Sequence, residues 1–133
     1  MRTATVDSNV WVSAFHFRGK PRQLIELAEA AEAQIHISEH IIAEVLRVLR
    51  LKFHWSDEIL AEANRQMREI AQLVTPDSTL EVIRDDPADN RILECAHSAG
   101  SDCIVTGDND LLRLGSFGNV PIVTVAEFLA TRG

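Results

Sequence analysis

Apolar residues recur along the chain with two different spacings, which alternate. Short apolar or β-branched runs predict strands over residues 3–6, 35–37, 80–83, 103–106 and 122–125. Between them, apolar positions at helical spacing predict helices over 10–17, from Pro21 to about residue 33, after Ser38, after Ser56, from Pro87 to about residue 99, over 109–114 and from 126 to 131. The pattern is therefore one of strands alternating with helices.

The ends of several of these helices carry recognisable signals. Ser38 and Ser56 are residue types that accept hydrogen bonds at a helix start, Pro21 suits a first helical turn, and Gly100 suits a helix end. The strand residues are apolar without strict alternation, which is typical of a parallel sheet covered on both faces. We therefore expect an α/β fold, a single domain over residues 1–133 with a central parallel sheet of about five short strands flanked by helices on both faces.

Composition supports an ordinary globular protein. Of its 133 residues 46% are hydrophobic and 25% charged, which excludes a disordered chain. No stretch approaches the roughly 18 apolar residues of a membrane span, and Asp7 interrupts the start before an apolar signal region can form, so we expect a cytoplasmic protein without a membrane partner. Cys95 and Cys103 are expected to be reduced and buried, and no zinc site is expected, because the histidines form no H-E-x-x-H motif.

Acidic residues mark four places where chemistry is expected. Asp7 ends the first strand, Glu44 lies inside a helix, and the segments D-D-P-A-D-N (85–90) and T-G-D-N-D (106–110) are both rich in carboxylates. Parallel strands end at the same sheet edge, so the fold favours a site there. Carboxylates gathered without basic partners repel one another unless a cation lies among them, and such a set suits Mg²⁺ or Mn²⁺.

Each of these acids also has a purely structural interpretation. The alternatives are a turn for Asp7, an ion pair with Arg47 for Glu44, helix capping for Asp86 and Asp89, and an Asx-turn or cap for Asp108 and Asp110. The joint placement of the acids, more than any one of them, favours a metal site.

Taken together, these segments resemble a known family. The strand that leads into D-S-N-V, the helical Glu44, the segment D-P-A-D-N-R-I-L-E-C-A and the segment I-V-T-G-D-N-D-L-L are similar to those of PIN domains, over residues 3–128. The resemblance is strongest to stand-alone proteins of the VapC type, the toxin components of toxin–antitoxin systems.

The resemblance implies a metal-dependent ribonuclease. It places the catalytic and metal-binding acids at Asp7, Glu44, Asp89 and Asp108, with supporting roles for Asn9, Asp86, Thr106 and Asp110. It also implies one or two Mg²⁺ or Mn²⁺ ions, an RNA substrate, a cognate antitoxin protein and a homodimer.

The formal net charge of −7 argues against an ordinary basic nucleic-acid binder. If the acids face one metal pocket, however, the rest of the chain is close to neutral. The candidates for contact with RNA phosphates are then Arg91, Arg47, Arg18 and Lys20.

Two other functions fit parts of the pattern. A Mg²⁺-dependent phosphatase of the haloacid-dehalogenase type also begins with an aspartate after the first strand, but it needs a second aspartate where this chain has Asn9. A non-catalytic PIN-like interaction module is the other alternative. Loss of Mg²⁺-dependent or Mn²⁺-dependent cleavage on mutation of Asp7 or Asp89 distinguishes the enzyme from both.

Overall fold

The computed structural model describes residues 1–17, 19–76 and 87–131, with residues 87–89 described by their backbone. The elements follow the order β1 (Arg2–Val6), α1 (Ser8–His16), α2 (Lys20–Glu29), β2 (Ala33–Ile37), α3 (Glu39–Phe53), α4 (Asp57–Ile70), β3 (Gln72–Leu73), α5 (Pro87–Ala99), β4 (Cys103–Val105), α6 (Asn109–Leu114), β5 (Ser116–Phe117), β6 (Val120–Val123) and α7 (Val125–Ala130). No helix in these ranges is long and apolar enough to cross a membrane.

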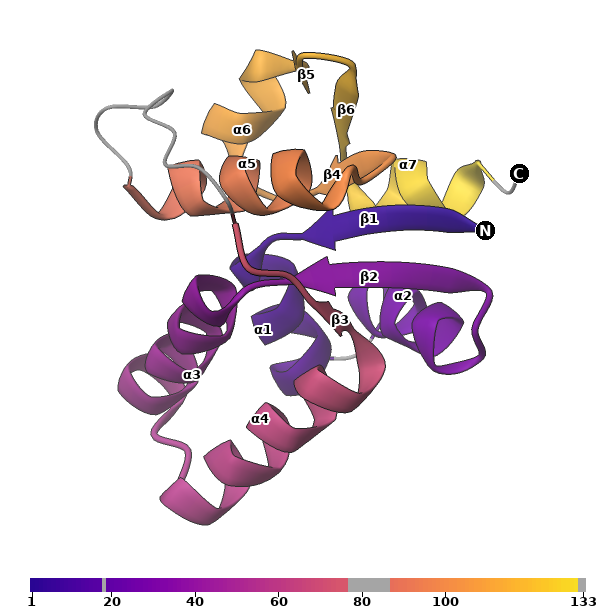
Figure 1. The fold of residues 1–133 in the computed structure, drawn as a ribbon. Helices are drawn as coiled ribbons and strands as arrows, with labels where there is room; N and C mark the ends of the chain where they lie inside the picture. The colour runs from indigo at the N-terminus through magenta and orange to yellow at the C-terminus, as the bar shows by residue number, and fades with distance from the viewer. Residues whose placement is uncertain (18, 77–86, 132–133) are drawn as a thin grey trace.

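The strands form one sheet in the order β3-β2-β1-β4-β6-β5 (Figure 1). All neighbouring pairs are parallel except β5 and β6, which are antiparallel. Val6 lies beside Val105 in the register of β1 and β4, so the residues that follow these two strands leave the sheet side by side. The chain crosses between non-adjacent strands at this point, which is where open α/β sheets place their ligands.

Helices cover both faces of the sheet. α5 packs against β1, β2 and β4, whereas α2 packs against β2, α1 and α7. The Thr5 hydroxyl lies 3.8 Å from Cys95 Sγ of α5, so Thr5 faces α5. Because alternate strand residues share a face, Asp7 follows on the same side as Thr5. The centre of the core consists of fully buried β-branched residues from the strands, namely Val6, Ile35, Ile37, Ile104 and Val105.

The α/β class predicted from the sequence is confirmed, as are most elements. Ser38 accepts from the Ile41 N–H and Ser56 from the Ile59 N–H, so both predicted caps are present. The predicted length of the helix that contains Pro21 is wrong, because α2 ends at Glu29. The chain turns through Ala31 at a φ of 58°, a conformation that an alanine does not signal in a sequence.

The two shortest strands were not predicted. β3 and β5 have two residues each, which is too short to show a period of two, and β5 makes the sheet mixed at its edge. The last predicted strand begins and ends two residues earlier, as β6. Ile59, an apolar residue of the helix predicted after Ser56, is 52% exposed. The strand predicted over residues 80–83 lies outside the described residues.

A polar network is buried between the sheet and the α5 side of the fold. The Ser101 Oγ lies 2.7 Å from His36 Nδ1 and 2.8 Å from Thr5 Oγ1, and His36 is 5% exposed. The two cysteines nearby are free and buried, as predicted, and burial raises the pKa of each thiol to about 11. These thiols are therefore protonated and unreactive at neutral pH.

Because His36 is buried, the protein should lose stability in mild acid. Burial lowers its pKa from the ordinary value, and the charge of Asp102 opposes this shift. The unfolded chain therefore binds more protons below about pH 6.5, and the free energy of unfolding should fall by up to about 1.4 kcal/mol per pH unit from this group. Urea denaturation between pH 7.5 and 5.5 measures this loss of stability, since these pH values lie about one unit either side of the ordinary pKa of histidine in an unfolded chain.

The matched control for His36→Gln is His97→Gln, which alters an exposed histidine. His36→Gln should flatten the pH dependence, whereas His97→Gln should leave it unchanged. An equal slope in the parent and in His36→Gln would show that other groups cause the effect.

Candidate active site

Asp7 is a buried carboxylate at the carboxyl end of β1. It is 4% exposed and occupies the position before α1, yet its side chain makes no hydrogen bond that caps this helix. Its Oδ2 instead accepts from Thr106 Oγ1 at 2.6 Å, and its Oδ1 accepts from Ser8 Oγ at 3.3 Å. The turn interpretation of Asp7 therefore does not explain where its carboxylate points, which is towards the end of β4.

The pKa of Asp7 is raised above its ordinary value by its surroundings in the site. Burial raises it most, the hydrogen bond from Thr106 lowers it, and the negative charge of Asp108 raises it further. Thr106 is fully buried and its Oγ1 also accepts from the Asp108 N–H at 3.0 Å. This one hydroxyl therefore fixes Asp7 and the backbone of Asp108 relative to each other.

Asp108 serves the local structure as well. Its Oδ1 accepts from the Asp110 N–H at 2.8 Å and caps α6, as its structural interpretation predicted. Asp110 is exposed and pairs with Arg113 at 3.3 Å. Asn9, also exposed, accepts from the Gly107 N–H at 3.4 Å through Oδ1 and so ties the segment after β1 to the segment after β4.

Glu44 borders the same region from α3. A cavity of about 330 Å³ lies between α1, α3 and α5, and its lining includes Ser8, Glu44, Arg47 and Arg91. Both Glu44 carboxylate oxygens accept from Arg47, at 3.1 and 2.8 Å, so the predicted ion pair is present. Each of those oxygens has a second lone pair, so this pairing leaves room for a metal ion.

The other candidates lie at different places. Asp89 is the third residue of α5, and its side chain, like Asp86 and Arg18, lies outside the described part of the chain. Lys20 is exposed and begins α2, so the length of α1, about 13 Å, separates it from Ser8. Of the basic candidates, Arg47 and Arg91 line the cavity next to the acids.

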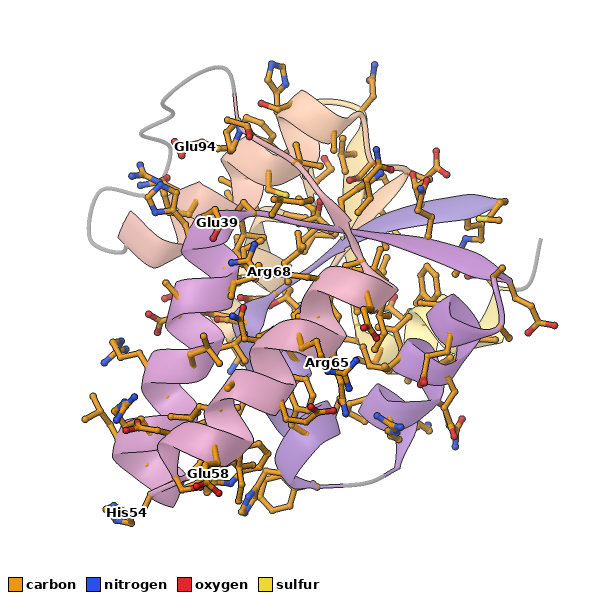
Figure 2. The ribbon with its side chains drawn as sticks, turned by 60° about the horizontal axis from the view of Figure 1, so that its bottom comes forward. Glu39, His54, Glu58, Arg65, Arg68 and Glu94 are labelled. Carbon is orange, nitrogen blue, oxygen red and sulfur yellow. The ribbon has the colours of Figure 1, made fainter. Side chains whose placement is uncertain are left out.

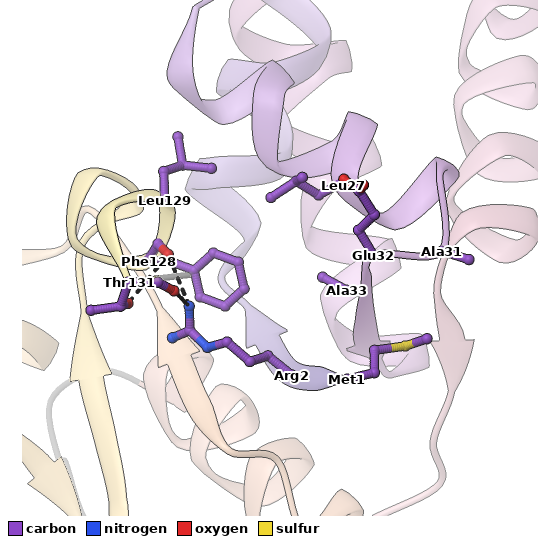
Figure 3. Close-up of a pocket in the computed structure, with 9 residues that line it drawn as sticks. All are labelled: Met1, Arg2, Leu27, Ala31, Glu32, Ala33, Phe128, Leu129 and Thr131. Carbon is purple, nitrogen blue, oxygen red and sulfur yellow. Dashed lines mark hydrogen bonds between the residues drawn. The ribbon is translucent and has the colours of Figure 1, made fainter. Parts of the chain in front are cut away.

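A larger cavity lies far from these acids. It has a volume of about 420 Å³ and lies at the amino ends of β1 and β2, lined by residues such as Arg2, Leu27, Glu32 and Phe128 (Figure 3). Arg2 crosses it to donate to the Phe128 carbonyl at 2.9 Å. Open α/β sheets bind ligands at the opposite, carboxyl edge, so its size does not make it the catalytic site.

Comparison with known proteins decides the family. A family model described as PIN domain matches residues 3–110. The chain is a PIN-domain protein. Among solved structures it is similar to a chain of VapBC2 from Rickettsia felis bound to a DNA fragment from their promoter, with a TM-score of 0.65, 14% identity, and coverage of 92% of this chain and 98% of that chain. This likeness shows a common fold, and no curated protein matches the sequence.

The donor set of this PIN domain suits a hard divalent cation. Asp7 is buried beside a second carboxylate, and a cation between them would offset both the burial cost and the repulsion. Within the described residues no three acidic, histidine or cysteine side chains gather closely enough to hold a metal ion. Asp7, Glu44 and Asp108 are all among these described residues, so the three do not by themselves form such a group.

Sequence reasoning missed three residues around the PIN-domain site. Ser8 donates to Asp7 and lines the cavity, while His40 lines the same cavity one helical turn before Glu44. Glu94 is a 5% exposed carboxylate whose Oε1 lies 2.7 Å from Arg91 Nε. The buried position of Glu94 in the segment I-L-E-C-A was the available signal, because charged residues are rarely buried unless paired.

Replacing the Thr106 hydroxyl with a methyl group should strongly reduce both activity and stability. Thr106→Val removes the donor to Asp7 and leaves the Asp108 N–H without this acceptor, so we expect cleavage to fall about 10–100-fold and stability by about 1–3 kcal/mol. Thr106→Ser keeps the hydroxyl and is the matched control. Rates of nucleic-acid cleavage and urea denaturation measure the two effects, and equal cleavage by Thr106→Val and the parent protein would contradict this role.

Proposed function

We propose that this PIN-domain protein is an endoribonuclease that depends on Mg²⁺ or Mn²⁺. The observation that supports it most is the buried Asp7, turned away from the helix it precedes and held by Thr106 beside Asp108. In this proposal Asp7, Glu44, Asp89 and Asp108 bind the cation, with Asp86 and Asp110 as neighbours. A bound cation supplies an activated water and stabilises the leaving oxygen of the phosphodiester.

The chain's own residues position these parts. Thr106 orients the Asp7 carboxylate, and Asn9 holds the two segments at the sheet edge together. Arg47 and Arg91 line the cavity next to Ser8 and are placed to contact RNA phosphates. Arg18 and Lys20 are proposed as contacts with more distant parts of the RNA, since Lys20 lies beyond the far end of α1.

The experiment that tests this function is cleavage of a fluorescent single-stranded RNA by the purified protein. Cleavage is expected with Mg²⁺ or Mn²⁺ and should stop with EDTA. Intact RNA under all conditions would favour the interaction-module alternative, and cleavage that EDTA does not change would exclude a dissociable metal.

We further propose that the protein is the toxin of a toxin–antitoxin pair and forms a homodimer. The resemblance to VapC proteins and the shared fold with a chain of VapBC2 support the pair. The exposed Ile59 on α4 supports an apolar contact between copies. Light scattering should give a dimer mass, and a monomer mass at all working concentrations would contradict the homodimer.

A further inference from the structure

Two cavities meet at the beginning of α3, and two side chains border both of them. The first is the 330 Å³ cavity that Ser8 and Glu44 line. The second, of about 230 Å³, is lined by residues that include Glu39 and Pro76. His40 and Arg91 line both cavities, so the two cavities adjoin at these side chains, and this adjoining pair is called the path below.

Two arginines, Arg47 and Arg91, line this path, and a third, Arg68, contacts Glu39 of its lining; their partners differ. Arg47 is paired with both oxygens of Glu44, and Arg68 binds both oxygens of Glu39, which joins the start of α3 to the end of α4 (Figure 2). Arg91 is 29% exposed along its side chain, and the Glu94 carboxylate beneath it is 5% exposed. Arg91 lines both cavities, whereas the mostly buried Glu94 carboxylate borders the second cavity alone.

We infer that Arg91 binds a phosphate of the RNA strand on this path and that Glu94 is the positioning residue that holds the Arg91 guanidinium. The inference rests on the proposed ribonuclease function. A guanidinium matches phosphate geometry with paired donors, and a partner on the same helix limits the orientations it can adopt. Ser8, which contacts Asp7, lines the same cavity as Arg91, so the bound phosphate lies close to the acids.

A role in stability alone explains the Arg91–Glu94 pair less well. Burying a carboxylate costs several kcal/mol of solvation, and the ion pair repays this only in part, so buried pairs are weak stabilisers. A buried carboxylate that keeps an arginine in one orientation at the edge of a cavity serves binding directly. This reasoning predicts that Glu94 acts on RNA affinity through Arg91 and not independently of it.

The test is binding of a fluorescein-labelled oligouridylate about 12 nucleotides long, measured by anisotropy over a series of salt concentrations. All variants carry Asp7→Asn so that the probe stays intact. Arg91→Gln should weaken binding about tenfold. It should also reduce the slope of log affinity against log salt by about 0.7, the value for one phosphate contact on a single strand. Glu94→Gln should weaken binding in the parent background and have no effect when Arg91→Gln is already present.

Arg65→Gln is the matched control, because Arg65 is an exposed α4 arginine paired with Glu62 and Glu69 and lines neither cavity (Figure 2). It should leave the slope unchanged. An Arg91→Gln slope equal to that of Arg65→Gln, or a further loss of affinity from Glu94→Gln in the Arg91→Gln background, would overturn the inference.

Folding and catalysis are measured separately. If circular dichroism shows that Glu94→Gln does not fold, Glu94→Asp replaces it: this variant keeps the charge, withdraws the carboxylate by one methylene and should also lose affinity through Arg91 alone. Failure of the protein without Asp7→Asn to cleave RNA in Mg²⁺ would overturn the ribonuclease function, whereas the salt slopes and the double variant decide the role of Arg91 and Glu94.

Discussion

Asp7→Asn is expected to reduce RNA cleavage by more than the roughly 10–100-fold that loss of a partner around a metal site costs. The amide keeps the size of the carboxylate and can still accept from Thr106, but it removes a negative ligand from the proposed cation site. Cleavage rates in saturating Mg²⁺ measure the effect. Asp57→Asn, the same change at an exposed acid paired with Arg50, should cleave at the rate of the parent protein.

The same variant should be more stable than the parent protein when no metal is present. Because burial and the charge of Asp108 raise the pKa of Asp7, its ionised form destabilises the fold at neutral pH. This cost disappears as the pH falls through the raised pKa, so the advantage of Asp7→Asn should be largest near neutral pH and shrink in acid. Urea denaturation in EDTA measures it, and wild-type cleavage by Asp7→Asn would contradict the catalytic role.

The placement of Asp7 was predictable because it depends on the topology of the sheet. An aspartate that ends an apolar run lies at the carboxyl edge of a parallel strand, and Thr106 and Asp108 follow another strand in the same way. That β1 and β4 are neighbours, with Val6 beside Val105, is a long-range property that no local pattern contains. The resemblance to PIN domains implied that Asp7 and Asp108 share one site, which the periodicity could not show.

The features that escaped prediction have physical reasons of the same kind. Helix α2 ends at Glu29 and the chain turns at Ala31 in a left-handed conformation, which an alanine does not signal in a sequence. Glu94 occupies a position on α5 where exposure or burial depends on which helix packs opposite, and α3 covers that side. Glu44 has both a structural role and a proposed chemical one, because its pairing with Arg47 leaves lone pairs for a cation.

Asp89→Asn should largely abolish stabilisation of the protein by divalent cations. A ligand that binds the folded chain alone stabilises it by about 2.7 kcal/mol at 100 times its dissociation constant, so Mn²⁺ or Mg²⁺ should raise the melting temperature of the parent protein. In the proposed function Asp89 is a metal ligand together with Asp7, Glu44 and Asp108, and without it the described residues hold no group of three possible ligands. Asp89 is the third residue of α5, where the amide loses only a favourable charge–dipole interaction of about 0.3–1 kcal/mol, so without metal the variant should still fold.

Comparison with Asp110→Asn makes this measurement specific to the site. Asp110 is exposed and paired with Arg113, so it contributes at most an indirect contact to the cation, and its amide variant should keep most of the metal-induced shift. Calorimetric titration of Mn²⁺ into each protein gives the affinities independently of cleavage. Equal Mn²⁺ affinity in Asp89→Asn and the parent protein would show that Asp89 is not a ligand. If Mn²⁺ and Mg²⁺ did not raise the melting temperature of the parent protein, the acids at the carboxyl edge of the sheet would have structural roles alone.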